Sequence, residues 1–248
     1  MKNSNKFILI VLSFMAAVMI VLTVMFRVMF AGHFEITNDG DGFNFSNGSE
    51  LMLSDEFDYK GFDEIKVVGG WDILVISSSE FDISVDYNEA ARDSAEIRKS
   101  GDVLYLSLDY QRSGMASDFH GASATIYMPE LEAVSVDGAV NLNIENFSGD
   151  KLDFDLDGAG QIIGENCSYE QFDIDTNGAV NVDFYDSKVV SADVNIDGAG
   201  NVQLRMAGGE LSGRLSGLAR LEYTGKVSEL TVAEDGIANV EYVKNAGN

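Results

Sequence analysis

A short motif centred on glycine recurs at a nearly constant interval through the second half of the chain. Its first four copies have the form Asp/Asn-Gly-Ala, and two weaker copies, Ser-Gly-Leu and Asp-Gly-Ile, follow. The repeated glycines are Gly138, Gly158, Gly178, Gly198, Gly217 and Gly236. A fixed period of about 20 residues is typical of a solenoid, in which each repeat forms one coil stacked on its neighbours.

Apolar and polar residues alternate on both sides of the repeated glycine. After it, positions two, four and six are apolar or glycine in all six copies, and the residues between them are polar except for Ile163. Before Gly158, the apolar residues Leu152, Phe154 and Leu156 alternate with aspartates. Period-two alternation predicts β-strands with one buried face and one solvated face.

The pairing of these strands follows from the face that each apolar residue occupies. In a hairpin with a two-residue Asp-Gly turn, Leu156 would pair with Ala159, and the apolar residues of the two strands would lie on opposite faces. A three-residue loop restores a common face, but it puts the left-handed residue at Ala159 rather than at Gly158. A coil that pairs in parallel with the next repeat has no such conflict. We therefore predict an all-β fold, a parallel β-helix with coils of about 20 residues and the Asp-Gly pair at a corner.

The segment from residue 59 to residue 128 carries strand signals without the repeat. Within this segment, a helix is predicted only over Glu89–Lys99. Trp71, the single tryptophan, is expected in the core, with stacking on a sugar as the alternative. The predicted strands are Ile65–Val68, Asp72–Ile76, Phe81–Val85, Val103–Leu108 and Ala124–Met128.

The N-terminal segment predicts where the chain is located. Residues 7–30 form an apolar run that contains one charge, and two lysines precede it. About 20 helical residues span the roughly 30 Å core of a bilayer, and a short basic segment stays in the cytoplasm. The predicted organisation is a cytoplasmic N-terminus (1–6), a transmembrane signal-anchor helix (7–30), a linker (31–55) and an extracytoplasmic β-helix domain (56–248). The alternative is a cleaved signal peptide, whose apolar region is usually shorter, about 7–15 residues.

The composition excludes several classes of function. The chain has 41 acidic and 16 basic residues and a formal net charge of −25, whereas a nucleic-acid-binding surface needs clustered Lys and Arg. The single cysteine, Cys167, excludes an intramolecular disulfide and a cysteine-rich metal site, and is expected to point inward. Only two histidines are present, His33 and His120, and the acids recur with the repeat instead of breaking it as a catalytic pair would. We therefore predict no catalytic residues and no enzyme activity.

Two ordered sets of residues resemble a known family. The first is Gly61–Val67 followed by Gly69–Val75, and the second is Met128–Leu131 followed by the Asp-Gly-Ala repeats. Together they make about residues 59–243 similar to the head GIN domain, a family also called putative auto-transporter adhesin. The resemblance implies a single-stranded right-handed parallel β-helix that is exported, often anchored, and has no established activity. This chain carries Asp or Asn where the family often has Ser, so its repeat edge is more acidic.

Outward-facing aspartates are expected to stack from coil to coil about 4.8 Å apart. Two carboxylates at that spacing repel by roughly 1 kcal/mol in water, so columns of them favour a hard cation with oxygen ligands, calcium first. The alternative is that these side chains are hydrated and that Asp and Asn occur because they suit corners. The candidate metal ligands are Asp153, Asp155, Asp157, Asp173, Asp175, Asp193 and Asp197.

Amides and the last coil give the remaining hypotheses. Asn141, Gln161, Asn181 and Asn201 occupy one outward position of successive coils, which predicts a hydrogen-bonded amide ladder, with glycan recognition as the alternative. The last coil, Gly236–Val243, leaves a strand edge that predicts self-association. The function is then that of an adhesin or envelope-interaction protein with a glycan or protein ligand. The alternatives are a calcium-dependent or carbohydrate-binding module and a self-associating structural element.

Overall fold

The computed structural model describes residues 52–109 and 122–244, which are almost entirely strands. The predicted membrane helix over residues 7–30 lies outside the described residues, as do His33 and His120. In the described part of the chain, no helix is long and apolar enough to span a bilayer. The elements are β1 (Met52–Glu56), β2 (Glu64–Ser77), β3 (Asp82–Asn88), α2 (Glu89–Arg92), β4 (Ala95–Ser100), β5 (Val103–Leu108), β6 (Ala122–Met128), β7 (Ala133–Glu145), β8 (Ser148–Glu165), β9 (Ser168–Ala207), β10 (Glu210–Lys226) and β11 (Glu229–Tyr242).

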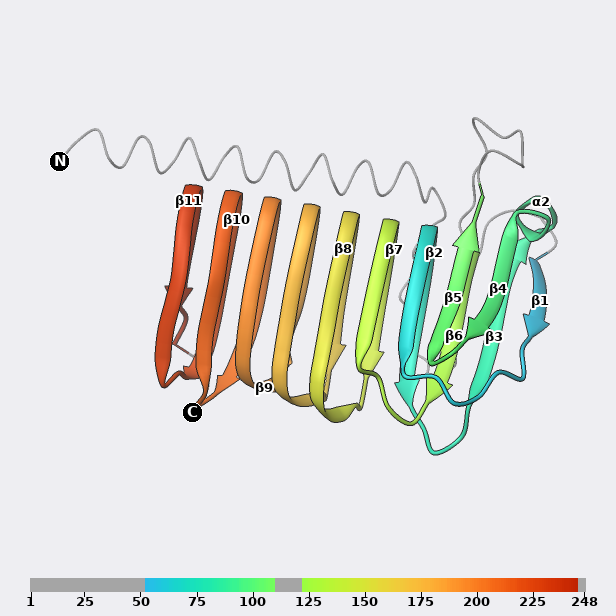
Figure 1. Cartoon of the computed structure of the whole chain (residues 1–248), viewed down its shortest axis with the longest axis horizontal. Helices are drawn as coiled ribbons and strands as arrows, with labels where there is room; N and C mark the ends of the chain where they lie inside the picture. Colours follow the sequence, from blue (N-terminus) through green and yellow to red (C-terminus); the bar gives the residue numbers. More distant parts are fainter. Residues whose placement is uncertain (1–51, 110–121, 245–248) are drawn as a thin grey trace.

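The repeats from β7 to β11 stack as a row of parallel coils (Figure 1). Each coil pairs with the equivalent positions of the next one, so that Gly138 lies beside Gly158 and Gly198 beside Gly217. The long strand β9 contains two successive copies of the repeat. The predicted all-β, mostly parallel sheet is confirmed.

The chain folds back on itself at each repeated glycine, and the core lies between the two arms. Phe172 and Phe184, which lie equally far before and after Gly178, have ring centroids 4.5 Å apart. On either side of Gly198, the Ile196 side chain lies so close to Gly200 that an added Cβ would meet it at 2.8 Å. Residues at equal distances before and after the glycine therefore face each other, which explains why both arms bury the same alternate positions.

The repeated glycines form a column in which each backbone touches the one before it. Gly178 has φ +138°, and a Cβ added there would lie 2.0 Å from the carbonyl oxygen of Gly158. Gly198 has φ +135° and the same relation, at 2.2 Å, to the oxygen of Gly178. Only glycine combines a positive φ with so close an approach of another backbone, so the column requires glycine for two independent reasons.

The column begins earlier in the chain than the repeat indicates. In β2, Gly69 pairs with Gly138 of β7, so β2 is the coil that precedes the repeats in space. The other side of β2 pairs in parallel with β5 along its first half and with β6 along its second half. These two strands follow β2 in sequence but precede it in the stack.

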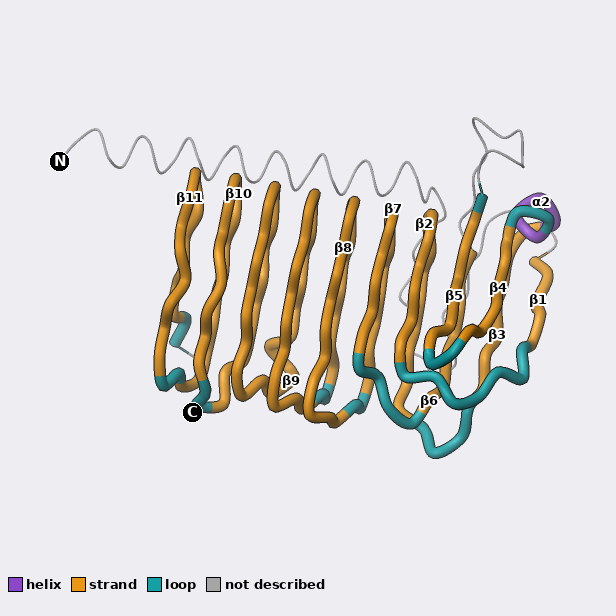
Figure 2. The backbone as a smooth tube through the Cα atoms, viewed as in Figure 1, coloured by secondary structure: helices purple, strands orange, loops and turns teal. Residues whose placement is uncertain are grey.

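Antiparallel strands cover this end of the stack (Figure 2). Strand β3 pairs antiparallel with β6, β4 with β5, and β1 with β3, so β1 brings residues of the predicted linker into the sheet. The prediction of a helix over Glu89–Lys99 is wrong beyond Arg92. The helix α2 ends there, and Ala95–Ser100 form the strand β4. Its pairing with β5, including Arg98 stacked 3.7 Å above the Tyr105 ring, overrides the local preference for helix.

The opposite end of the stack is formed by β11. Among the described residues, β11 pairs only with β10, and its outer edge has no partner. The large hydrophobic side chains exposed there are Leu230, Ile237 and Tyr242. The two ends of the solenoid are therefore different, one covered by short antiparallel strands and one left as a long parallel edge.

The glycine column predicts a position-specific stability loss. Gly178→Ala is expected to lower the free energy of unfolding by about 3 kcal/mol or more, because the new methyl group meets a backbone oxygen at an unfavourable φ. Gly101→Ala is the matched control: φ is +62°, but a Cβ there meets nothing within 4 Å, so the expected loss is only about 1 kcal/mol. Chemical denaturation monitored by circular dichroism measures both. Equal losses would contradict the stacking constraint.

Candidate functional site

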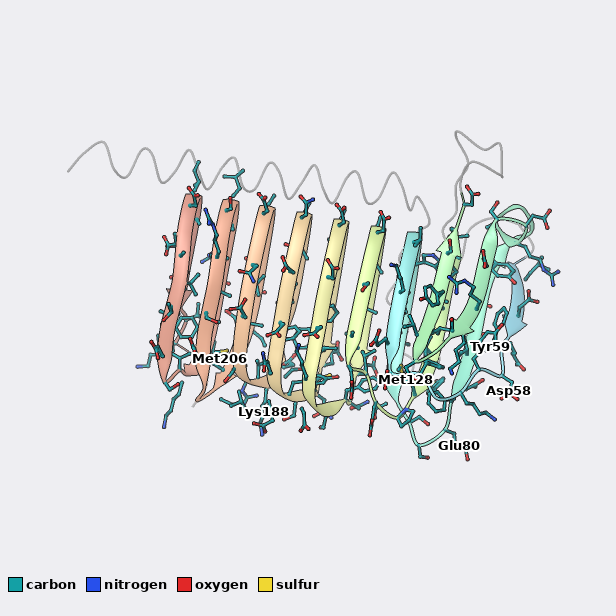
Figure 3. All side chains as sticks on the ribbon, viewed as in Figure 1. Asp58, Tyr59, Glu80, Met128, Lys188 and Met206 are labelled. Atoms are coloured by element: carbon teal, nitrogen blue, oxygen red, sulfur yellow. The ribbon has the colours of Figure 1, made fainter. Side chains whose placement is uncertain are left out.

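The predicted aspartate columns form on the outward face of the arm that precedes each glycine. Asp153 lies beside Asp173, and Asp155 lies beside Asp175. Asp157 is followed by Asn177, not by another aspartate. Asp193 and Asp197 lie one repeat further along β9, beside Ser212 and Ser216 of β10. Figure 3 shows side chains projecting outward along the whole row of coils.

A lysine bridges the first of these columns. The Nζ of Lys151 lies 2.8 Å from Oδ2 of Asp153 and 3.2 Å from Oδ2 of Asp173. Hydrogen bonds to these two carboxylates raise the pKa of Lys151, so the amine is charged at neutral pH. The Nε2 of Gln171 also donates to both carboxylate oxygens of Asp173 at 3.1 Å. The chain itself therefore supplies a cation to the position where the sequence predicted a metal.

Two more of the predicted ligands have hydrogen-bond donors from the protein. Asp193 accepts hydrogen bonds from Oγ of Ser212 and from Nδ2 of Asn195, both at 2.6 Å. Asp157 accepts a longer one, 3.4 Å, from Nδ2 of Asn177. These contacts run along or between coils, so the carboxylates help to hold the stack together.

Asp155, Asp175 and Asp197 have no such donors, since none of the three carboxylates makes a hydrogen bond or ion pair to another described residue. Of these, Asp155 and Asp175 lie side by side. Partial burial raises the pKa of Asp175, and the charges of Asp155 and Asp193 raise it further. Within residues 52–109 and 122–244, no group of three or more His, Cys, Asp or Glu side chains is placed to hold a metal ion. Cation binding by the columns stays a prediction of the sequence.

The amide column lies on the outward face of the other arm. Asn201 donates from Nδ2 to Oδ1 of Asn181 at 3.0 Å, which is one step of the predicted ladder. Among the described residues, Gln161 makes no hydrogen bond to Asn141 or to Asn181, so the ladder is not continuous. At the start of the column, Asn141 donates at 3.1 Å to a carboxylate that sequence analysis missed, Oδ1 of Asp72. The position of Asp72 relative to Gly69 was the available signal, because Asn141 has the same spacing from Gly138.

Asp72 is held in a poorly solvated environment. Burial raises the pKa of its carboxyl group to about 6, and the hydrogen bond from Asn141 opposes this shift without cancelling it. The group is therefore charged at neutral pH at a cost to the folded state. The coil that precedes it in space supplies no charged partner, because Ser123 of β6 lies beside Asp72.

A second cluster that sequence analysis missed interrupts the amide column near its end. Glu222 is only 7% exposed, accepts a hydrogen bond from Nε2 of Gln203 at 2.7 Å and contacts the guanidinium of Arg220. Arg220 also reaches Oε2 of Glu241 at 3.0 Å. Burial and the charge of Glu222 raise the pKa of Tyr185 to about 12. The sequence signal for this cluster was Arg220, which takes the position that Asn or Gln holds in the preceding coils.

Trp71 and Cys167 are core residues, as predicted. Trp71 is buried, and its Nε1 donates to the carbonyl oxygen of Val68 at 3.1 Å. Cys167 is buried, and desolvation raises the pKa of its thiol, which keeps the sulfur in its less reactive protonated form. Its backbone N–H donates to Oγ of Ser187 in the next coil at 2.9 Å. Neither side chain is available to an external ligand.

Comparisons with known proteins identify a matching family and similar folds. Residues 61–204 match the family described as "Putative auto-transporter adhesin, head GIN domain". The fold is similar to a putative adhesin from Bacteroides fragilis, with a TM-score of 0.65 and 16% identity over 79% of this chain and 98% of that one. A putative adhesin from Parabacteroides merdae gives a TM-score of 0.48 and 16% identity over 79% and 97%. A search of the curated proteins finds no match.

Asp72 predicts a specific pH dependence. Its folded pKa, about 6, lies above the usual value near 4, so the folded state holds the extra proton and stability falls as pH rises between these values. Asp72→Asn removes this loss and is expected to raise the free energy of unfolding at pH 7.5 by on the order of 2 kcal/mol, with little change near pH 4.

Thermal unfolding between pH 4 and pH 8 measures this difference. The exposed Asp150→Asn is the control and is expected to leave the pH profile unchanged. If Asp72→Asn shifts the melting temperature equally at all pH values, burial of the carboxylate is not the cause.

Proposed function

This chain belongs to the head GIN domain family of putative auto-transporter adhesins, and from that premise we propose that it is a membrane-anchored, extracytoplasmic adhesin or envelope-interaction protein without catalytic activity. We extend to it the right-handed winding that the family resemblance implies. The apolar run over residues 7–30, preceded by two lysines, supports the anchor and its orientation.

The observation that carries this proposal is the register of the coils. Equivalent outward side chains recur at every step of the stack, as Asn141, Gln161 and Asn181 do along one face. Strands in a sheet are about 4.8 Å apart, so each face presents the same polar groups at a short, regular interval. Such a surface suits a ligand that is itself extended or repeated, such as an envelope glycan or a protein surface, and many weak contacts then add up.

The absence of catalysis is proposed from the way the acids are used. Asp153 and Asp173 are bridged by Lys151, and Glu222 is held by Arg220 and Gln203. A general acid and a general base need a matched pair of carboxyl groups whose environments separate their pKa values. These carboxylates are instead occupied by partners that join neighbouring coils, which is the behaviour expected of structural groups.

Calcium-dependent binding on the same scaffold is the second candidate. The observation that favours it is the pair Asp155 and Asp175, which lie in register and have no donor among the described residues. Desolvation, and after it the charges of Asp155 and Asp193, raise the pKa of Asp175, and a cation would relieve the repulsion between these charges. Lys151 argues against this candidate, because its charge already neutralises the neighbouring column of Asp153 and Asp173.

Labelling of intact cells tests the proposed topology. With Cys167 buried, a cysteine introduced at Ser228, which is exposed, is expected to react with a membrane-impermeant maleimide once the outer layers are permeable. A cysteine at Asn5 in the same full-length chain is the control and is expected to stay unlabelled. The reverse pattern would contradict the orientation.

The same cells test adhesion. After the same permeabilisation of their outer layers, cells that carry the full chain are expected to retain isolated cell envelopes several-fold better than cells without it, because many weak contacts act together. Protease or periodate treatment of the envelopes then separates a protein ligand from a glycan ligand. Equal retention with and without the chain would contradict the adhesin proposal.

A calcium titration separates the two candidates. We expect calcium and magnesium at equal ionic strength to change the melting temperature equally, because protein donors already serve most of the aspartates. A calcium-selective rise that Asp155→Asn and Asp175→Asn both abolish would support the calcium-dependent module. Asp153→Asn is the control, since Lys151 occupies that column.

A further inference from the structure

The outer edge of β11 is long, apolar in part, and unpaired among the described residues. It runs from Glu229 to Tyr242, and the exposed fractions of Leu230, Ile237 and Tyr242 are 45%, 45% and 54%. An edge of this kind is a template for pairing with another strand. The question is which strand fits it.

The bend at Gly236 restricts which strand can pair along the whole edge of β11. The chain folds back at each repeated glycine, so β11 has two arms, and residues equally far before and after Gly236 face each other, as Phe172 and Phe184 do around Gly178. Only a twofold axis that bisects the bend places both arms of one β11 on both arms of another. We propose that two copies of this chain pair in this way, antiparallel and centred on Gly236.

This register places apolar residues opposite one another. Leu230 and Tyr242 are equally far from Gly236, so Leu230 of one copy lies opposite Tyr242 of the second. Val232 lies opposite Val240 of the second copy. Each pair occurs twice because the axis is twofold, so the exposed Leu230 and Tyr242 side chains of both copies are covered. Cross-strand pairs of this kind are the stabilising unit of a sheet.

The same register keeps the acidic residues apart. Glu229 lies opposite Val243 of the second copy, Asp235 opposite Ile237, and Glu241 opposite Thr231. No acid meets an acid directly, although the chain has a net charge of −25. Like charges directly opposite each other destabilise a strand pair, so the charge pattern of β11 is compatible with this pairing.

The other end of the stack does not fit this edge. The terminal strands there, β1 and β4, have five and six residues, whereas β11 has 14. They also end at different heights, because one arm continues beyond β2 as β5 and β4 and the other as β6, β3 and β1. A head-to-tail contact would therefore pair only one arm of β11 and would continue into an open fibre. Pairing of β11 with β11 matches the full length and closes after two copies.

Glu234 limits the strength of this pairing. It occupies the inward position that Leu215 holds in the preceding coil, and it lies opposite Ala238 of the second copy. An inward-pointing charge is one of the ways in which proteins restrict pairing at a strand edge. Glu234→Leu is therefore expected to tighten dimerisation by about tenfold or more, because an apolar side chain replaces a carboxylate in the interface.

Disulfide cross-linking tests the register. Ala233 and Asn239 are exposed on the outward faces of the two arms, and the register places each opposite the other in the second copy. A mixture of full-length Ala233→Cys and Asn239→Cys, kept in mild detergent, is expected to give a covalent dimer on mild oxidation. Either variant alone should not, since its two cysteines lie on opposite faces of the dimer.

The control is a mixture of Thr231→Cys and Asn239→Cys, which is out of register by two residues, about 7 Å along the strand. That offset puts the sulfurs beyond disulfide reach. Equal cross-linking in both mixtures, or none in the first while its circular dichroism spectrum matches wild type, overturns the proposal. Sedimentation of the unmodified full chain is an independent measurement: a strict monomer at high concentration, with no tightening in Glu234→Leu, also overturns it.

Discussion

The contact of one glycine backbone with the next is the interaction on which this structure depends. At each corner the Cα approaches the preceding carbonyl oxygen so closely that a Cβ at Gly178 would lie 2.0 Å from it. This approach brings the arms of successive coils into register, and the register in turn stacks the aromatic core of Phe154, Phe172 and Phe184. Every outward column, whether of aspartates or of amides, follows from the same alignment.

The sequence predicted the repeat region and the strands β2, β3, β5 and β6 that precede it, but not the order in which those four strands stack. A strict period and alternation are sufficient to specify a parallel stack, because any other pairing would put apolar residues in water. The position of β2 ahead of β7, and of β5 and β6 ahead of β2, carries no such signal: Gly69 is a single copy of the corner, far from Gly138 in the sequence. The sequence did not predict strand β4, because the local pattern favours a helix and only the pairing with β5 makes this segment a strand.

The sequence predicted where the candidate site lies, but not which groups its carboxylates contact. Spacing alone places Asp153 beside Asp173, yet it does not show that Lys151 reaches both carboxylates from the neighbouring outward position. The environments of Asp72 and Glu222 could not be predicted either, since burial at an outward position depends on the side chains of adjacent coils. Membership of the head GIN domain family and the repeated polar faces together support an adhesive role built from many similar contacts.

Amide hydrogen exchange on the native protein is the measurement that tests the central claim most directly. If stacked glycine corners hold the coils in register, the amides of Gly158, Gly178 and Gly198 exchange only with global unfolding, as slowly as the strand residues around them. Amides along β11 should exchange faster in dilute solution, because that coil is supported from one side only. Corner glycines that exchange at the rate of an open turn would show that the corners are independent loops and would contradict the account.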